Sequence, residues 1–347
     1  MARMQTLEQL RESYRLRSVR WGFYWALWCA LLWGLWYIPG TAVWYEKPFV
    51  DLGSGGTSEY LIIAAVITAF SAIAVLCSLY IWLGVLGKIG EYGCTIRRFR
   101  ISKWFYLGAI FGGPCALFGS FLAIGYVGPL FAAIAALMYP VVGASLARIW
   151  YHERISQRAA IGIAVILIGG VCVYVPGLIS ELSNPNDSAW LGLLGGIMAA
   201  FGWGIEGAIA GRALDVSDPD VGITIRFTGE VFYWVFIIMP LIVIFSDFEV
   251  IGLMLASLSF WPLIWILLSG GCFGFCYVAW YKSFPLIGVG RGQAIAAFYG
   301  IFAVIFIAIF TLTLPKWYFI IGLMLTIIGG ALMFTEKSKM LEIIRSN

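Results

Sequence analysis

The sequence predicts an all-α membrane protein, with ten transmembrane helices in two inverted five-helix repeats and both termini cytoplasmic. Composition, the length of the apolar runs and the placement of basic residues lead to this prediction. The 347-residue chain is 62% hydrophobic and only 12% charged, and its mean hydropathy is +0.93. Soluble domains are nearer half apolar and a quarter charged, so this composition excludes a soluble core of such size.

The apolar runs match the thickness of a bilayer. Each is about 18 to 25 residues long, the length that a helix needs to cross roughly 30 Å of hydrocarbon. They lack the alternation over about ten positions that is typical of membrane barrels. The predicted spans are 21–45, 60–87, 104–125, 129–150, 158–178, 190–211, 223–246, 260–282, 290–314 and 317–335.

Four segments follow from these spans: a basic cytoplasmic N-terminal segment (1–20), a first five-helix repeat (21–180), a second repeat (188–335) and a cytoplasmic tail (336–347). No cleaved signal is expected, because no apolar core with a small-residue cleavage site follows the arginine-rich start. Leu7, Leu10 and Tyr14 fall on one helical face. The N-terminal segment is therefore either a helix lying on the membrane surface or a disordered basic tail.

Lysine and arginine placement sets the orientation, because basic loops stay cytoplasmic. With the N-terminus inside, of the 22 basic residues only Lys47 and Lys316 fall on the outer side. Arg226, Lys282 and Arg291 are counted at the cytoplasmic ends of their spans. We therefore expect a multi-pass protein of the plasma (inner) membrane.

An internal repeat divides the predicted spans into two halves of five helices each. An offset of 160 positions pairs Gly128 with Gly288 and Tyr139 with Tyr299, and it also carries "IGIAVILIGG" onto "IGLMLTIIGG". An offset of 170 pairs "ALLWG" with "AFGWG". Five crossings in each repeat place the second upside down, an arrangement in which a central site and alternating access are expected.

These motifs resemble the drug/metabolite transporter superfamily, in its EamA-like branch. "ALLWGLWYIPG" is similar to that family's first helix, and "LMYPVVGASLARIWYHERIS" is similar to its fourth, with Pro140 in mid-span and Glu153 and Arg154 at the exit. The resemblance implies a ten-helix permease. The second half departs from the pattern, with Gly300 and Thr313 in place of proline and glutamate. We therefore expect a straighter ninth helix.

Several kinds of chemistry are excluded or disfavoured. His152 is the only histidine, which argues against a histidine-based triad or a zinc site. Most cysteines lie in apolar runs and act as small hydrophobes. No phosphate-binding glycine loop precedes a lysine, so direct ATP drive is not indicated. We expect no metal, no cofactor, no nucleic-acid partner and no enzyme; the chain is a monomer or a homodimer.

Glu206 is the first candidate site residue, since it lies inside an apolar span with no opposite charge within four residues. Intramembrane ionisable residues are functional candidates by default. The alternative is that Glu206 hydrogen-bonds a neighbouring helix or reaches toward Arg212. A coupled proton is also expected to use Glu206, if burial favours its neutral form.

Aromatic residues at matching depth are the other candidates. Cations gain about 0.5–2 kcal/mol over such rings, although rings in apolar spans are more often packing residues. The candidates are Trp33, Trp36, Tyr37, Tyr139, Trp203, Trp280 and Tyr299.

Polar residues near span ends are assigned more ordinary roles. Arg291 and Gln293 open the ninth span and are anion or gate contacts if they face the cavity; Arg291 otherwise only obeys the charge bias. Arg226 and Glu230 are four residues apart on one helix and are expected to pair.

The expected function is secondary-active transport of a small polar metabolite: an amine, a quaternary ammonium compound or an amino acid. A sugar or organic anion is the alternative substrate, because aromatic rings also stack on sugars and Arg291 suits an anion. A non-transporting membrane scaffold is the third reading, and a lipid-modifying enzyme the least favoured.

Overall fold

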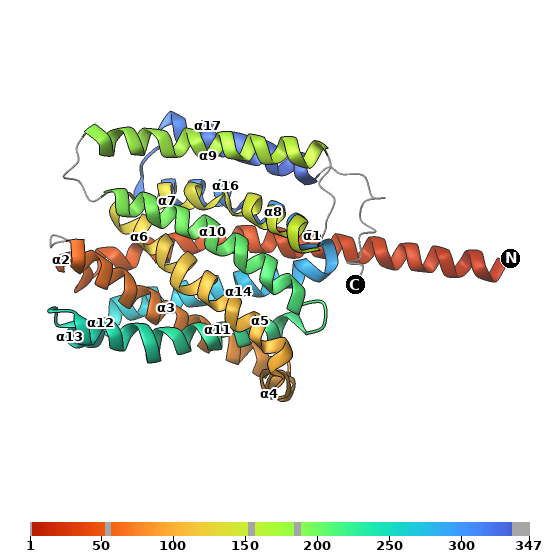
Figure 1. Ribbon diagram of the computed structural model, residues 1–347, viewed down its shortest axis with the longest axis horizontal. Helices are drawn as coiled ribbons and strands as arrows, with labels where there is room; N and C mark the ends of the chain where they lie inside the picture. The colour runs from red at the N-terminus through yellow and green to blue at the C-terminus, as the bar shows by residue number, and fades with distance from the viewer. Residues whose placement is uncertain (1, 53–56, 152–156, 184–188, 335–347) are drawn as a thin grey trace.

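The computed structural model of the protein describes residues 2–52, 57–151, 157–183 and 189–334 (Figure 1). Within these ranges all regular structure is helical. The helices are α1 (Ala2–Ala42), η1 (Val43–Tyr45), α2 (Phe49–Leu52), α3 (Thr57–Val85), α4 (Ile89–Arg97), α5 (Phe99–Ile110), η2 (Phe111–Leu117), α6 (Phe118–Tyr126), α7 (Pro129–Ala136), α8 (Tyr139–Tyr151), α9 (Gln157–Ser183), α10 (Ala189–Ala213), α11 (Pro219–Tyr233), η3 (Trp234–Ile238), α12 (Met239–Phe245), α13 (Val250–Ala256), α14 (Phe260–Ile287), α15 (Val289–Ala296), α16 (Tyr299–Thr311) and α17 (Trp317–Phe334).

Eight helical stretches in the described ranges are long and apolar enough to cross a membrane. They are Arg17–Tyr45, Thr57–Val85, Phe99–Tyr126, Pro129–Trp150, Trp190–Ala213, Pro219–Phe245, Phe260–Ile287 and Val289–Thr311. Two shorter apolar helices, Ala160–Cys172 and Trp317–Leu332, occupy the predicted fifth and tenth spans. The prediction of an α-helical membrane protein is confirmed, and the total of ten crossings stays a prediction.

Helices α9 and α17 run alongside each other at one edge of the bundle (Figure 1). Glycines permit this close approach. A Cβ atom added to Gly169 would lie 2.7 Å from the carbonyl oxygen of Gly322, and one added to Gly329 would lie 2.5 Å from that of Gly162. Small residues at such contacts let helix backbones approach closely within a membrane.

The N-terminal segment is a continuation of the first span. Helix α1 is unbroken from Ala2 to Ala42 and projects from the bundle along its own axis (Figure 1). The structure therefore favours neither of the two predicted forms, a separate surface helix or a disordered tail. Helix α4 lies at the end of the bundle from which α1 projects, and α2 and α13 lie at the opposite end (Figure 1).

The fourth and ninth spans are both broken, at corresponding places. Helix α7 ends at Ala136 and α8 begins at Tyr139, while α15 ends at Ala296 and α16 begins at Tyr299. The expectation of a straighter ninth helix was therefore wrong. The ninth span breaks without a proline at this site, and a tertiary contact accompanies each of the two breaks.

The two contacts at the breaks are hydrogen bonds between the halves of the chain. The Tyr139 hydroxyl donates to the backbone carbonyl of Gln293 at 2.6 Å. The Tyr299 hydroxyl donates to the backbone carbonyl of Ala133, also at 2.6 Å. Each tyrosine thus binds a carbonyl in the last turn before the break in the other span.

Two other spans each contain a π-helical segment. Segment η2 contains Gly112, Gly113 and Pro114 and lies between α5 and α6, and η3 lies between α11 and α12. Single π turns inside α-helices are frequent at functional sites. Segment η2 packs against α10, the helix that carries Glu206.

Candidate functional site

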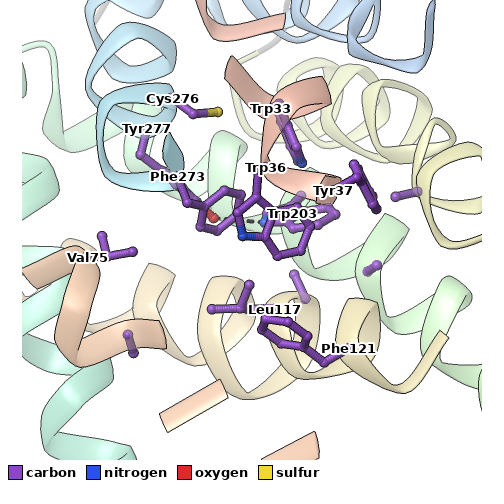
Figure 2. Close-up of a cluster of buried hydrophobic side chains, with 14 of the residues drawn as sticks. Trp33, Trp36, Tyr37, Val75, Leu117, Phe121, Trp203, Phe273, Cys276 and Tyr277 are labelled. Carbon is purple, nitrogen blue, oxygen red and sulfur yellow. Dashed lines mark hydrogen bonds between the residues drawn. The ribbon is translucent and has the colours of Figure 1, made fainter. Parts of the chain in front are cut away.

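Eight aromatic side chains form the centre of the bundle, and we call them the aromatic cluster. Its members are Trp33, Trp36, Tyr37, Tyr139, Trp203, Phe273, Trp280 and Tyr299, each at most 1% exposed. They come from helices in both halves of the chain. Figure 2 shows the side chains of α1, α10 and α14 converging.

Trp33 has the most ring contacts in the cluster. Its ring centroid lies 4.6 Å from that of Trp203, at a steep angle, and 4.6 Å from that of Tyr299, nearly parallel. Tyr139 and Trp280 lie at 5.4 Å and 5.8 Å. All seven aromatic residues singled out in the sequence therefore meet in one cluster.

Phe273 is the member that sequence reasoning missed. Its ring stacks on Trp36 with centroids 4.6 Å apart. It is four residues before Tyr277 and seven before Trp280, so all three share a face of α14. That spacing was the available signal.

Several polar atoms in and beside the cluster have no hydrogen-bond partner among the described residues. They include the indole nitrogens of Trp33 and Trp280 and both side-chain amide atoms of Gln293. Gln293 is fully buried, and its amide lies against Gly143 of α8 and Gly207 of α10. Because buried polar groups are almost always paired, this concentration of unpaired groups calls for a cause.

Arg291 differs from its neighbour Gln293. It lies in the first turn of α15 and is only partly buried. Of the two anion or gate candidates, Gln293 adjoins the aromatic cluster.

Glu206 is not the lone acid that the sequence suggested. The Nε atom of Arg226 donates to it at 2.6 Å, and the hydroxyls of Tyr277 and Tyr281 donate at 2.9 Å and 3.1 Å. Arg212 instead stacks over the Trp104 ring at 4.8 Å. The expected hydrogen bonds from other helices are therefore present, and a functional role of Glu206 stays a prediction.

The long side chain of Arg226 reaches Glu206 from α11, a helix that packs mainly against α5, α3 and α14. The sequence analysis counted Arg226 at the cytoplasmic end of its span, and the structure buries its side chain completely, with 0% exposed. Its guanidinium also lies over the rings of Phe227 and Tyr277, with distances of 4.0 Å and 4.8 Å to the centroids.

Glu230 completes a group of three that we call the ion triad: Glu206, Arg226 and Glu230. The predicted pairing of Arg226 with Glu230 is confirmed, through Nη1 and Oε2. All three side chains are 0% exposed. The other oxygen of Glu230, Oε1, has no hydrogen-bond partner among the described residues.

Segment η2 lies directly on the ion triad. A Cβ atom added to Gly112 would collide with Arg226 and Glu206, and one added to Gly113 would lie 2.5 Å from the carboxyl carbon of Glu230. The two glycines therefore make room for the charged side chains. Sequence reasoning missed them, together with Tyr277 and Tyr281, although the "FGGP" run inside an apolar span was visible.

A hydrogen-bonded chain joins the ion triad to the aromatic cluster. The indole nitrogen of Trp203 donates to the Tyr277 hydroxyl at 2.8 Å (Figure 2). Tyr277 in turn donates to Glu206 at 2.9 Å. Two successive hydrogen bonds therefore connect Glu206 of the triad to the Trp203 ring of the cluster.

A second ionic group lies near the start of α11, and we call it the lysine–aspartate cluster: Lys88, Asp218, Asp220 and Lys282. Lys88 lies 2.7 Å from both aspartates, and Lys282 lies 3.0 Å from Asp220. Partial burial of Lys88 acts to lower its pKa, but hydrogen bonds to the two carboxylates outweigh burial and raise it.

No group of three or more metal-ligating side chains occurs in the part of the chain that the structure describes. His152, Glu153 and Arg154 lie outside the described residues.

Comparison with known proteins gives a fold but no family. No family model and no curated protein matches this chain. A solved structure described as "Crystal structure of protein" is similar over 92% of this chain and 98% of its own, with a TM-score of 0.54 and 18% sequence identity. At this identity the likeness concerns the fold alone.

Proposed function

We propose that this protein is a secondary-active transporter of a small polar metabolite, working by alternating access between two inverted halves. The proposal rests mainly on the unpartnered polar atoms in and beside the closed aromatic cluster, where helices of both halves meet. A polar substrate would satisfy these atoms. Transporter sites characteristically lie at such an interface, beside broken helices.

Reciprocal contacts support the inverted repeats. Tyr139 binds the carbonyl of Gln293, and Tyr299 binds that of Ala133; the offset of 160 relates both the tyrosines and the carbonyls. The glycine contacts between α9 and α17 exchange corresponding residues in the same way. Contacts in which i meets j and j meets i are typical of a two-fold relation.

The donors and rings together favour a zwitterion such as an amino acid as substrate. Two indole N–H groups and the Gln293 amide are donors for a carboxylate. The faces of the surrounding aromatic rings attract an ammonium group. Simple amines and quaternary ammonium compounds satisfy only the second requirement.

A sugar is the second candidate, and the neutrality of the cluster is the observation that favours it. Glu206 is already paired with Arg226, and the eight members of the aromatic cluster carry no carboxylate to bind a substrate ammonium. Gln293 offers both a donor and an acceptor for hydroxyl groups.

The cluster must open for any of these substrates. The near-parallel rings of Trp33 and Tyr299, with centroids 4.6 Å apart, are in direct contact and leave no room between them. Substrate entry therefore requires α1 and α16 to separate. We assign this closed arrangement to a substrate-free step of the cycle, in a protein of the plasma membrane with both termini cytoplasmic.

A ligand screen by thermal shift, followed by flux into proteoliposomes, tests the proposal. Amino acids, amines, quaternary ammonium compounds and sugars are the probes. A substrate should stabilise the wild type and Gln157→Leu, whose site is exposed at the start of α9, but not Gln293→Leu. A protein that moves no probe, or a Gln293→Leu variant with unchanged binding, would favour the scaffold reading or another site.

A further inference from the structure

The charges of the ion triad do not balance. It holds two carboxylates and one guanidinium, each 0% exposed. With every group ionised, one negative charge stays uncompensated inside a protein whose helices are embedded in lipid. Such a charge costs several kcal/mol, and a buried group normally becomes neutral instead.

Among the described residues, the surroundings of Glu230 supply no second cation. The charged and titratable groups near it there are Arg226 on its own helix, Glu206 on α10, and Tyr277 and Tyr281 on α14. Segment η2 contributes the backbone of Gly113.

Neighbouring helices meet other faces of α11. On α5, the ring of Tyr106 packs against Gly229. On α4, the Tyr92 hydroxyl bonds to Thr228, and on α3 the Trp82 indole bonds to Asp220. Lys88 and Lys282 are already engaged by Asp218 and Asp220.

The hydrogen bonds distinguish the two carboxylates. Glu206 accepts from Arg226 through Nε and from both tyrosine hydroxyls. These donors favour its ionised form. Glu230 accepts from Arg226 alone, through Oε2. Its Oε1 atom is buried with no partner among the described residues.

We propose that the ion triad is a proton-binding site and that Glu230 takes the proton, at Oε1. The proton comes from hydronium on one side of the membrane and returns to water on the other, and no other bond is made or broken. Protonation brings the net charge of the triad to zero. The role of the triad in coupling protons to transport rests on the proposed transport function. Proton binding by the triad does not depend on that function.

The arrangement gives the proton a route of influence to the aromatic cluster. When Glu230 is neutral, Arg226 has one anionic partner, Glu206. When Glu230 is ionised, the guanidinium is shared between two. The difference reaches the cluster through the hydrogen bond that Tyr277 donates to Glu206 and the one that Trp203 donates to Tyr277.

Infrared difference spectroscopy of the purified protein, titrated with pH, tests proton binding without any substrate. The wild type should show a carbonyl band of a buried protonated carboxyl at neutral pH that disappears at alkaline pH. Glu230→Gln should lose this band and remain folded, because a glutamine resembles the protonated acid. Glu91→Gln, the same change at an exposed site, should keep it. An unchanged band in Glu230→Gln, or a failure of that variant to fold, would overturn the proposal.

The variant Glu206→Gln provides a second, independent result. It leaves Arg226 and Glu230 as a balanced pair, so Glu230 should ionise and its band should appear only at lower pH than in the wild type. A band unmoved by this substitution would contradict the charge balance on which the proposal stands.

Proteoliposomes separate this proposal from the transport function. With an amino-acid gradient and an internal pH dye, the wild type should move protons with substrate, whereas Glu230→Gln should exchange substrate without moving protons. If flux is equally proton-coupled in both proteins, the proposal for Glu230 is wrong and the transport function is retained. If there is no flux but the infrared band is assigned to Glu230, the transport function is wrong and the proton site is retained.

Discussion

The two ionic groups on α11 are built from similar side chains but differ in balance and exposure. The lysine–aspartate cluster has two positive and two negative side chains, and its lysines keep 28% and 19% of their surface exposed. The ion triad begins six residues further along α11, about 9 Å at the usual rise of a helix. It is fully buried and has two carboxyl groups for one guanidinium.

This difference favours a structural role for the lysine–aspartate cluster and, on our proposal, a functional role for the ion triad. The lysine–aspartate cluster ties the start of α11 to the segment after α3 and to α14, at a bundle end where water screens the charges. The ion triad gains little stability that packed apolar side chains would not provide, because desolvation offsets much of the attraction between buried charges. Its retention is understandable if the charge is used.

The largest effect is expected from Arg226→Met. This variant leaves two buried carboxylates without their cation, and breaking a buried pair typically costs about 3–5 kcal/mol. Lys282→Met is the control, since Asp220 keeps Lys88 and the Trp82 indole. The thermal midpoint in detergent should fall far more for Arg226→Met, and adding Glu206→Gln and Glu230→Gln should restore most of it. Equal midpoints for the two single variants would mean that the triad is not electrostatically coupled.

A smaller loss is expected from Gly112→Ala. The new methyl group would displace Arg226 and Glu206, and overpacking of this kind costs about 1–3 kcal/mol. Gly271→Ala on α14, where an added Cβ meets nothing within 4 Å, should be neutral or slightly stabilising. Thermal unfolding of both variants provides the measurement. A tolerated Gly112→Ala would show that η2 moves away from the triad freely.

In the balanced cluster, Asp218→Ala should cost less than the loss of Arg226. Asp218 caps α11 by accepting from the backbone nitrogens of Asp220 and Val221, and loss of such a cap costs about 0.5–2 kcal/mol. Asp218→Asn keeps the cap and removes the charge, so it should recover most of the thermal midpoint. If the two variants unfold alike, the ion pair with Lys88, rather than the cap, carries the stability.

The smallest effect concerns pH. The raised pKa of Lys88 means that its contribution is complete below the unfolded value of about 10.4 and is lost only as pH rises through the higher folded value. Stability from this partly buried cluster, about 1 kcal/mol, should therefore be constant between about pH 6 and pH 9. Across that range wild-type stability should fall as Glu230 ionises, and Glu230→Gln should remove the slope. If Lys88→Met, and not Glu230→Gln, removes the slope of stability against pH, then the lysine–aspartate cluster and not the ion triad is the pH-dependent group.

Sequence patterns located the helices and the aromatic cluster because both depend on local or repeated features. A span is recognisable from its own apolar run, and the offset of 170 that pairs Trp33 with Trp203 placed both rings at the centre. The repeat did not predict the break at Ala297–Phe298, since that break is accompanied by the hydrogen bond from Tyr139 rather than by a local proline.

The sequence by itself therefore determined the helical membrane class, the positions of most spans and the aromatic residues that meet. Only the tertiary structure decided how the charges pair. Arg226 reaches Glu206 from a different helix, 20 residues along the chain, and Tyr277 and Tyr281 come from 71 and 75 residues away. Hydrophobic periodicity fixes which way a helix faces, whereas the partner of a buried charge depends on which helices become neighbours.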